Sequence, residues 1–353
     1  MVIDKKYLDP FILATERAAY GASLFKGKGD KIAADQSAVD EMRNQLNKIN
    51  MKGRIVIGEG ELDQAPMLYI GEKVGNKSVE ELDIAVDPLE GTNFTAKNLP
   101  NALSVLAVTK KGNLLHAPDI YMEKIAIGAG FPDNLVDLDF DVQKNIGRLA
   151  DAKKISPDKI TACLLKRPRH DQIVNSLNSL GVKINFITDG DVSGVISVAD
   201  PKSNIDIYFG IGGGPEGVLA ASALGCLDCQ MQVRLSFQNE DEKNRCRDMG
   251  IKDLNQKYNI NDIVKGDVIF CATGVTDGDL VKGINDHGDS FDAETYVLHK
   301  SSNTNKIIKN NIKKWIINQL REKTGYLNNM MRNTQKKYTK HFILVKFYLK
   351  LFQ

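Results

Sequence analysis

The chain alternates short apolar runs of strand length with stretches of helical periodicity, from its first residues to about residue 299. Such alternation is typical of layered α/β and α+β folds, in which helices cover the faces of a sheet. At 353 residues the chain is long enough for one large domain or two ordinary ones. Its composition, 42% hydrophobic and 26% charged, excludes wholesale disorder.

The sequence predicts a soluble, cytoplasmic protein with no membrane span. No window holds 18 consecutive apolar residues, and the first 30 residues mix charged with apolar side chains. Five cysteines are an odd number in so large a chain, which favours reduced thiols. Cys226 and Cys229 form a lone C-x-x-C without a second pair at metal spacing, so a zinc or redox role is disfavoured.

Charge is divided unevenly along the chain. Residues 300–353 hold 13 Lys and Arg against one acid, Glu322, which gives a net charge of +12. Subtracting these from totals of 47 basic and 45 acidic residues leaves 34 and 44 in residues 1–299, a net charge of −10. An acidic body is a poor nucleic-acid binder and suits cations, so we expect no nucleic-acid partner for it. The tail, 306–353, is interpreted as a poorly ordered extension. The alternative for the tail is a membrane-surface or partner-binding helix.

The periodicity predicts individual elements. The predicted strands are 54–57, 82–86, 103–109, 114–117, 121–127, 161–166, 183–187, 205–211 and 268–272. Residues 110–113 resemble a hairpin turn between two of these strands. The predicted helices are 30–49, 168–180 and an Ala-rich segment that ends near Leu224. Ile308, Ile312 and Leu320 have the spacing of one further amphipathic helix.

Two halves are predicted to pack as one unit, because no Ser/Pro-rich linker separates them. They comprise residues 1–138 and residues 139–305.

Carboxylates follow the ends of predicted strands. Glu59 and Glu61 follow one strand, Asp63 lies just beyond them, and Asp87 and Glu90 follow the next strand. Strand ends in α/β proteins project side chains into a crevice, where an uncompensated carboxylate is costly. An all-oxygen set of ligands favours Mg²⁺ or Mn²⁺. The alternative is that these are solvated loop acids.

Asp35 is predicted to lie on the inward face of the helix that begins at Asp30. It lies three residues after Ile32 and four before Val39, both on the apolar stripe. A shared metal ion or Lys31 would compensate its charge.

Glycines mark two candidate anion-binding turns. Gly91 and Thr92 follow the second acidic strand end, where free backbone N–H groups suit phosphate and the Thr92 hydroxyl suits a water. The glycines at 212–214 fit either a simple strand–helix turn or a phosphate site. No Walker lysine follows them, so an NTPase is disfavoured.

Six segments together resemble class II fructose-1,6-bisphosphatases of the GlpX type, within the lithium-sensitive sugar and inositol phosphatase superfamily. The segments are 29–35, 57–68, 86–92, 166–171, 189–192 and 212–217. They occur in order over roughly residues 10–300. The resemblance implies a layered α-β-α-β-α sugar phosphatase fold of the α/β (α+β) class, and a homo-oligomer. Nothing after about Lys306 resembles the family's C-terminal segment.

The resemblance also assigns site residues and a cofactor of two or more Mn²⁺ or Mg²⁺ ions. Its metal ligands fall on Asp35, Glu59, Asp87, Glu90 and Glu216. Its catalytic positions fall on Thr92, which orients the attacking water, and on Glu59, Asp63 and Lys31. Its substrate-binding positions fall on Glu90, Gly91, Thr92, Tyr121, Lys166, Arg167, Pro168, Asp189, Gly190, Asp191 and Gly213.

The implied activity is metal-dependent hydrolysis of the 1-phosphate of fructose 1,6-bisphosphate to fructose 6-phosphate, a step of gluconeogenesis. Alternative functions are a phosphatase for sedoheptulose 1,7-bisphosphate or an inositol phosphate, and an inactive phospho-sugar-binding regulator. His170 follows two arginines and suits either substrate contact or a helix-start surface position.

Overall fold

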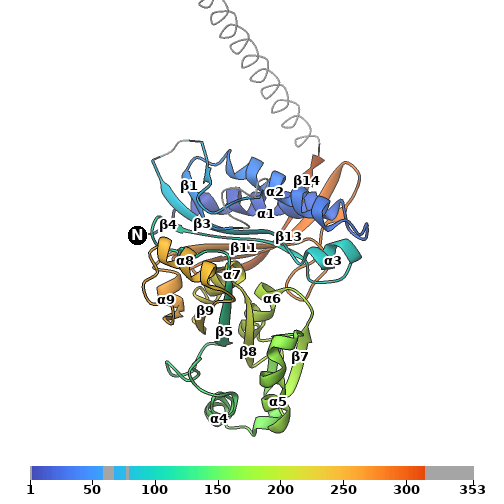
Figure 1. The fold of residues 1–353 in the computed structure, drawn as a ribbon. Coiled ribbons are helices and arrows are strands. Elements are labelled where there is room, and N and C mark those ends of the chain that lie inside the picture. Colours follow the sequence, from blue (N-terminus) through green and yellow to red (C-terminus); the bar gives the residue numbers. More distant parts are fainter. Residues whose placement is uncertain (1, 59–66, 77–78, 315–353) are drawn as a thin grey trace, which may run out of the picture. The chain divides into compact units, whose positions relative to one another are not determined.

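A computed structural model describes residues 2–58, 67–76 and 79–314. The chain divides into two compact units, one of residues 1–284 and 293–309 and the other of residues 285–292 and 310–353. The larger unit contains two mixed sheets (Figure 1).

The first sheet of the larger unit has the order β13-β11-β4-β3-β1-β2, with β14 beside β13. Its strands are β1 (Lys52–Ile57), β2 (Lys73–Val74), β3 (Glu81–Glu90), β4 (Leu103–Lys110), β11 (Val268–Gly274), β13 (Ser290–His299) and β14 (Thr304–Lys313). Among the described pairs of β1, β3, β4 and β11, the β1–β3 pair is parallel, whereas β3–β4 and β4–β11 are antiparallel. β3 is buried over nine of its ten residues, which places its C-terminal end inside the molecule.

The second sheet has the order β10-β9-β5-β8-β6-β7. Its strands are β5 (Tyr121–Ile127), β6 (Thr161–Leu165), β7 (Lys183–Ile187), β8 (Ile207–Gly213), β9 (Gln230–Ser236) and β10 (Lys257–Asn259). β5 lies at its centre and pairs antiparallel with both β8 and β9. The two faces of β5 contribute to separate cores, Met122 and Ala126 to one and Ile125 and Ile127 to the other.

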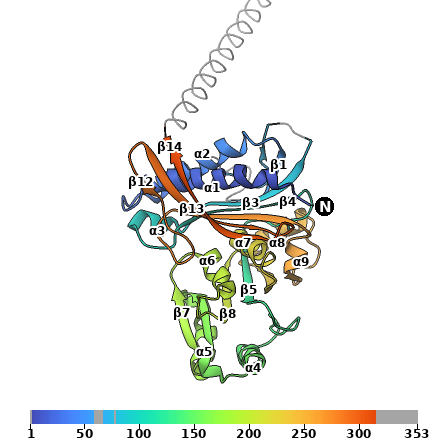
Figure 2. The same ribbon diagram turned by 180° about the vertical axis from the view of Figure 1, so that it is seen from behind.

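Helices cover the sheets in successive layers (Figures 1 and 2). α1 (Leu8–Ser23) and α2 (Lys31–Leu46) pack together on the first sheet. α6 (Asp191–Ile196) and α7 (Gly214–Leu224) lie between the sheets, where α7 contacts strands of both. α4 (Val142–Lys153) and α5 (Asp171–Ser179) pack together beyond the second sheet. The predicted layered α-β-α-β-α fold is confirmed.

The remaining short elements connect these layers. They are η1 (Lys5–Tyr7), α3 (Thr92–Lys97), η2 (Pro157–Lys159), η3 (Pro168–His170), η4 (Ser197–Ala199), α8 (Glu240–Asp248) and α9 (Ile260–Ile263). In the smaller unit, β12 (Asn285–Asp286) pairs with Phe291 and Asp292. Asn311 donates to Asp292 there over 2.7 Å.

Most predicted strands are confirmed, but three predictions are wrong. Leu114 makes only an isolated bridge, with Val264, so the predicted strand 114–117 does not form and 110–113 is not the turn of a hairpin. Ile32 is 84% exposed and does not belong to the buried stripe of α2. Ile308 and Ile312 lie in strand β14 rather than in a helix, and Leu320 lies outside the described residues.

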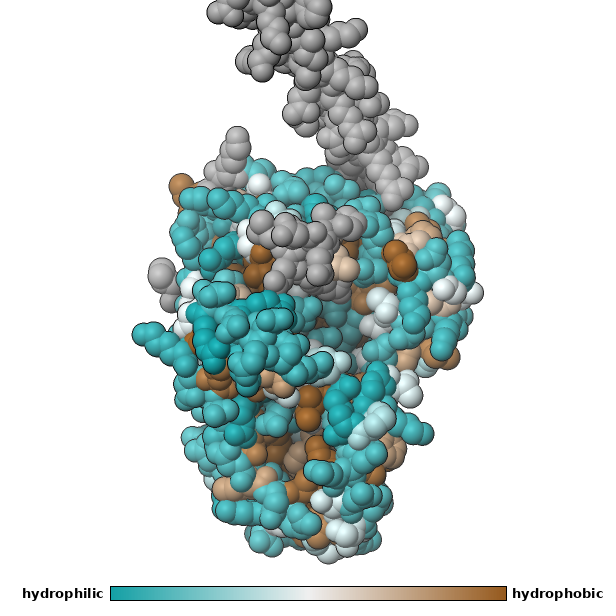
Figure 3. Space-filling view, viewed as in Figure 1, coloured by the Kyte–Doolittle hydropathy of each residue, from teal (hydrophilic) through white to brown (hydrophobic). Residues whose placement is uncertain are grey.

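The two sheets do not follow the boundary near residue 139. β5 precedes it yet lies in the second sheet, whereas β11 and β13 follow it and lie in the first. In the described part of the chain, no helix is long and apolar enough to cross a bilayer. Hydrophilic side chains cover most of the face seen in Figure 3.

Candidate functional site

A cavity of about 380 Å³ brings together residues from both predicted halves. It is lined by Asp87, Leu89, Glu90, Gly91, Thr92, Asp119, Tyr121, Leu165, Arg167, Arg169, Asp189, Asp191, Gly212, Gly213, Pro215 and Glu216. These residues come from the end of β3, the start of α3, the chain around the start of β5, the ends of β6 and β8, the turns after β6 and β7, and the start of α7.

The end of β3 supplies two buried carboxylates. Asp87 and Glu90 are only 6% and 4% exposed. The pairing of β3 with β4 shifts register between these two residues, which locally bends the strand. Leu89 donates its backbone N–H to Asp87 Oδ1 over 3.2 Å. Gly91 then adopts a left-handed conformation with φ of 83°, and α3 begins at Thr92.

The turn after β7 resembles the turn after β3, because a left-handed glycine again precedes the start of a helix. Gly190 is left-handed with φ of 80°, and α6 begins at Asp191. A Cβ atom on Gly190 would lie 3.4 Å from Cε2 of Phe94, so the starts of α3 and α6 are close neighbours. The N–H of Val192 donates to Glu90 Oε1, which joins α6 to the end of β3.

The turn after β8 holds a third carboxylate. Glu216 lies in the first turn of α7, a position that favours an acid. A Cβ atom on Gly213 would lie 2.0 Å from Glu216 Oε2, so glycine is required for the carboxylate to lie there. Gly213 therefore makes room for the Glu216 side chain.

Three carboxylates each leave one buried oxygen without a hydrogen bond. These atoms are Glu90 Oε2, Glu216 Oε2 and Asp35 Oδ1. Buried acceptors without donors are costly, and a hard divalent cation is the ligand that such oxygens suit. The donor chemistry therefore fits a Mg²⁺-like ion. No group of three or more His, Cys, Asp or Glu side chains is arranged to hold a metal ion within the described ranges alone, which omit Glu59, Glu61 and Asp63.

Burial raises the pKa of these carboxyl groups. Desolvation raises the pKa of Asp35 to about 6. Desolvation, and then the charges of Glu216, Asp191 and Asp189, hold the pKa of Glu90 well above its ordinary value, against the Val192 N–H. Desolvation also raises the pKa of Glu216, opposed by the charge of Lys124. A bound cation would stabilise the charged forms of these carboxyl groups and so lower their pKa.

Two arginines line the cavity. Arg167 follows β6, and Arg169 donates from Nε to the Ile211 carbonyl over 2.8 Å. The Arg169 guanidinium also lies 4.8 Å from the ring centre of Tyr121. Lys166, predicted beside Arg167, is exposed and does not line the cavity.

His170 is a buried structural residue. Its Nδ1 lies 2.7 Å from the Leu165 carbonyl, and Ile211 donates its N–H to Nε2 over 2.8 Å. The side chain ties β6 to β8 and has no free nitrogen for a substrate. The predicted alternative, a surface position at a helix start, is wrong, because His170 is fully buried.

The cavity gathers most, but not all, of the predicted site residues. Those that line it are Asp87, Glu90, Gly91, Thr92, Tyr121, Arg167, Asp189, Asp191, Gly213 and Glu216. Described residues outside its lining are Lys31, Asp35, Lys166, Pro168 and Gly190. Sequence reasoning missed Asp119, Leu165 and Arg169, although Arg169 follows Arg167 across a single proline.

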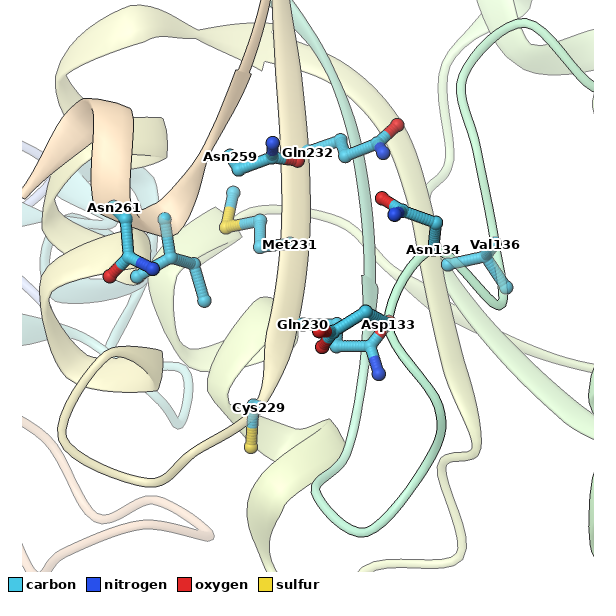
Figure 4. A pocket seen from close by; sticks show the side chains of 10 residues that line it. Asp133, Asn134, Val136, Cys229, Gln230, Met231, Gln232, Asn259 and Asn261 are labelled. Atoms are coloured by element: carbon cyan, nitrogen blue, oxygen red, sulfur yellow. The ribbon is translucent and has the colours of Figure 1, made fainter.

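A second cavity, of about 250 Å³, contains none of the predicted site residues (Figure 4). Asn134, Gln230, Gln232 and Asn259 are among its lining residues. Gln230 pairs with Ile127 at one end of β5, whereas Tyr121, which lines the first cavity, lies at the other end. The two cavities are therefore separated along that strand.

Comparison with known proteins finds extensive similarity. A family sequence model described as "Bacterial fructose-1,6-bisphosphatase, glpX-encoded" matches residues 5–312. "Fructose-1,6-bisphosphatase class 2" of Haemophilus influenzae is 42% identical over 308 residues, covering 83% of this chain and 92% of that protein. "Fructose-1,6-bisphosphatase 1 class 2" of Escherichia coli K12 is 42% identical over 308 residues, with 83% and 91% covered.

Solved structures give a weaker likeness. An inositol monophosphatase from Anabaena is 13% identical, with a TM-score of 0.37 over 65% of this chain and 83% of that chain.

Proposed function

This chain belongs to the family of bacterial, glpX-encoded fructose-1,6-bisphosphatases, and we propose that it removes the 1-phosphate of fructose 1,6-bisphosphate in the cavity at the end of β3. The products are fructose 6-phosphate and inorganic phosphate. The chain is thus a phosphoric monoester hydrolase, which acts on a bond whose uncatalysed hydrolysis is extremely slow.

The observation that carries the proposal is the lining of one cavity by two kinds of group. Asp87, Glu90 and Glu216 suit cations, whereas Arg167 and Arg169 suit an anion. A sugar bisphosphate requires both, because one phosphate is attacked and the other only needs to be held.

The family is metal-dependent, and Mn²⁺ or Mg²⁺ is proposed for this chain. Asp87, Glu90 and Glu216 would hold the ions together with Asp35 and Glu59, of which Glu59 lies outside the described residues. When bound, such ions neutralise phosphate charge and lower the pKa of a water.

Thr92 is proposed to orient the attacking water. Its side chain is partly exposed, it lines the cavity, and its position is fixed by Gly91 and the start of α3. A hydroxyl accepts one hydrogen bond while donating another, so it can hold water in line with the scissile bond. Lys31 and Asp63 remain proposed contributors.

The second half is proposed to bind the rest of the substrate. Arg167 and Arg169 would hold the 6-phosphate as fixed cations. Asp189 and Asp191 offer acceptors to sugar hydroxyls, and Tyr121 forms a wall beside Arg169. Lys166, Pro168, Gly190 and Gly213 remain proposed substrate positions, of which only Gly213 lines the cavity.

The test compares kcat/KM for fructose 1,6-bisphosphate, sedoheptulose 1,7-bisphosphate and inositol 1-phosphate, each with Mn²⁺, with Mg²⁺ and with EDTA. We expect fructose 1,6-bisphosphate to be the best substrate, with fructose 6-phosphate as the sugar product and no turnover in EDTA. A preference for either other substrate, or fructose 1-phosphate as product, would overturn the assignment. A cytoplasmic homo-oligomer in gluconeogenesis is proposed as its setting, and light scattering tests the assembly.

A further inference from the structure

Lys124 is a buried cation that contacts a residue of the cavity lining. It occupies the middle of β5, and its side chain is 0% exposed. Its ammonium group forms an ion pair with Oδ2 of Asp191, the residue that begins α6 and lines the cavity. Burying a lysine is costly unless its charge is compensated, and the Asp191 carboxylate supplies that compensation.

The glycines of the 212–217 segment leave space for this ion pair. A Cβ atom on Gly212 would lie 2.5 Å from Asp191 Oδ2 and 3.2 Å from Lys124 Nζ. A Cβ atom on Gly217 would lie 3.2 Å from Lys124 Cε. The strand β8 and the helix α7 are thus built without side chains where the lysine passes.

Tyr208 holds the other oxygen of the same carboxylate. Its hydroxyl group donates to Asp191 Oδ1, and the whole residue is 0% exposed. Burial, followed by the Asp191 charge, raises the pKa of Tyr208 well above its ordinary value, which keeps the phenol protonated as a donor.

Both carboxylate oxygens of Asp191 therefore accept a hydrogen bond from a buried residue, one in β5 and one in β8. It is only 5% exposed and is one of the residues that line the cavity. A carboxylate oxygen has about two acceptor positions, so these two bonds leave acceptor capacity on Asp191. A group fixed in this way loses little entropy on binding.

We propose that Lys124 and Tyr208 are positioning residues, which hold the Asp191 carboxylate in one orientation so that it accepts hydrogen bonds from the sugar hydroxyl groups of the substrate. The inference rests on the function proposed above, and it assigns the specificity of this part of the cavity to two residues that the substrate does not touch. A purely structural ion pair is the competing explanation.

The first test is Tyr208→Phe, which removes one hydrogen bond and keeps the ring. Tyr258→Phe, at another buried tyrosine of the second sheet, is the matched control. We expect the KM for fructose 1,6-bisphosphate to rise about five- to tenfold in Tyr208→Phe. The kcat/KM for phenyl phosphate, which lacks sugar hydroxyls, should stay within about twofold of the wild-type value. Tyr258→Phe should leave both substrates unaffected. Equal losses for both substrates, or an unchanged KM, would overturn the proposal.

The second test separates positioning from stability. Lys124→Met leaves the Asp191 charge uncompensated and should lower Tm, whereas the double variant Lys124→Met with Asp191→Asn should recover much of that Tm. We expect the KM for fructose 1,6-bisphosphate to stay raised in the double variant. Recovery of both Tm and KM would show a structural role only. Lys153→Met, which removes an ion pair with Asp206 outside the cavity lining, is the control.

Calorimetric binding of fructose 6-phosphate distinguishes this proposal from the proposed function. If wild-type protein binds this sugar phosphate but does not hydrolyse the bisphosphate, the catalytic assignment fails alone. In that case weaker binding by Tyr208→Phe still supports the positioning role. Binding equal to that of the wild type contradicts it, as does a wild-type protein that does not bind the sugar phosphate.

Discussion

Val192 donates its backbone N–H to a carboxylate oxygen of Glu90, a residue 102 positions earlier in the chain. The bond connects the start of α6 in the second half with the end of β3 in the first. The other oxygen of the same carboxylate, Glu90 Oε2, has no hydrogen-bond partner and can accept from a ligand. The proposed metal-binding and sugar-binding parts of the cavity are therefore fixed relative to each other by a direct contact.

Thr92→Val should lower kcat on the order of 100-fold or more and leave KM nearly unchanged, because a water-orienting hydroxyl acts mainly in the transition state. Thr95→Val, one turn along α3, is the control. Thr95 is fully buried and its hydroxyl has no hydrogen-bond partner, so this change should preserve kcat and keep or raise Tm. Steady-state kinetics and thermal melts of Thr92→Val and Thr95→Val measure these effects. A KM effect without a kcat effect in Thr92→Val would identify Thr92 as a binding residue only.

Arg167→Ala and Arg169→Ala should each weaken kcat/KM for fructose 1,6-bisphosphate by roughly 10- to 100-fold, the scale of a charged hydrogen bond. Phenyl phosphate has no second phosphate, so its kcat/KM should hardly change. Lys166→Ala should have a smaller effect than either arginine variant, since Lys166 does not line the cavity. Equal losses on both substrates would assign the arginines to the scissile phosphate or to the fold.

Gly213→Ala should abolish most activity while the protein stays folded, because the new methyl group would occupy the position of the Glu216 carboxylate. Gly147→Ala is the matched control, since a Cβ atom there meets nothing within 4 Å and lies within α4. That control should gain about 0.5–1 kcal/mol of stability, as expected for Ala replacing Gly in a helix. Full activity in Gly213→Ala would show that Glu216 is not needed where it lies.

The buried position of His170 predicts that the protein loses folding stability on acidification. Burial, and to a smaller extent the Arg169 charge, lowers the pKa of His170 below its ordinary value of 6.5. The folded state therefore favours the neutral ring, which accepts the Ile211 N–H. This contribution is fully present above 6.5 and is lost as the pH falls from 6.5 through the lowered pKa of the folded state.

The measurement is the drop in Tm between about pH 7.5 and about pH 5.5. We expect a smaller drop in His170→Gln than in wild type, although its Tm at neutral pH is lower. His287→Gln, with a side chain that is 42% exposed, should not reduce the drop. An identical drop in His170→Gln and wild type would contradict the assignment.

Periodicity predicted the strands and α2 well, because both signals come from alternating burial along one element. The predicted strand 121–127 matches β5, and α2 begins after its predicted cap Asp30, whose side chain accepts from Ala33 over 2.9 Å. The prediction for Ile32 failed because the first turn of α2 is exposed, a tertiary fact that helical spacing does not encode.

The site residues that belong to sequence motifs could be predicted. Those that depend on buried contacts between distant parts of the chain could not. Lys124 shares the face of β5 that holds Met122 and Ala126, so strict alternation places it among apolar residues. Its partner Asp191 lies 67 residues later, and nothing local reveals the pairing. The 212–214 glycines were interpreted as a turn or a phosphate site, and the pattern did not reveal that Gly212 and Gly213 also make room for Asp191 and Glu216.

The central claim is that this cavity hydrolyses fructose 1,6-bisphosphate with divalent ions held by its carboxylates. The most direct measurement is phosphate release from fructose 1,6-bisphosphate by wild type and Glu90→Gln, across a titration of Mn²⁺ from a chelated baseline, with Glu240→Gln as an exposed control. We predict that wild type and Glu240→Gln release phosphate with saturating Mn²⁺ dependence, while Glu90→Gln requires far more metal or stays inactive. Release by wild type in excess chelator, or an unaltered Mn²⁺ dependence in Glu90→Gln, would contradict the account.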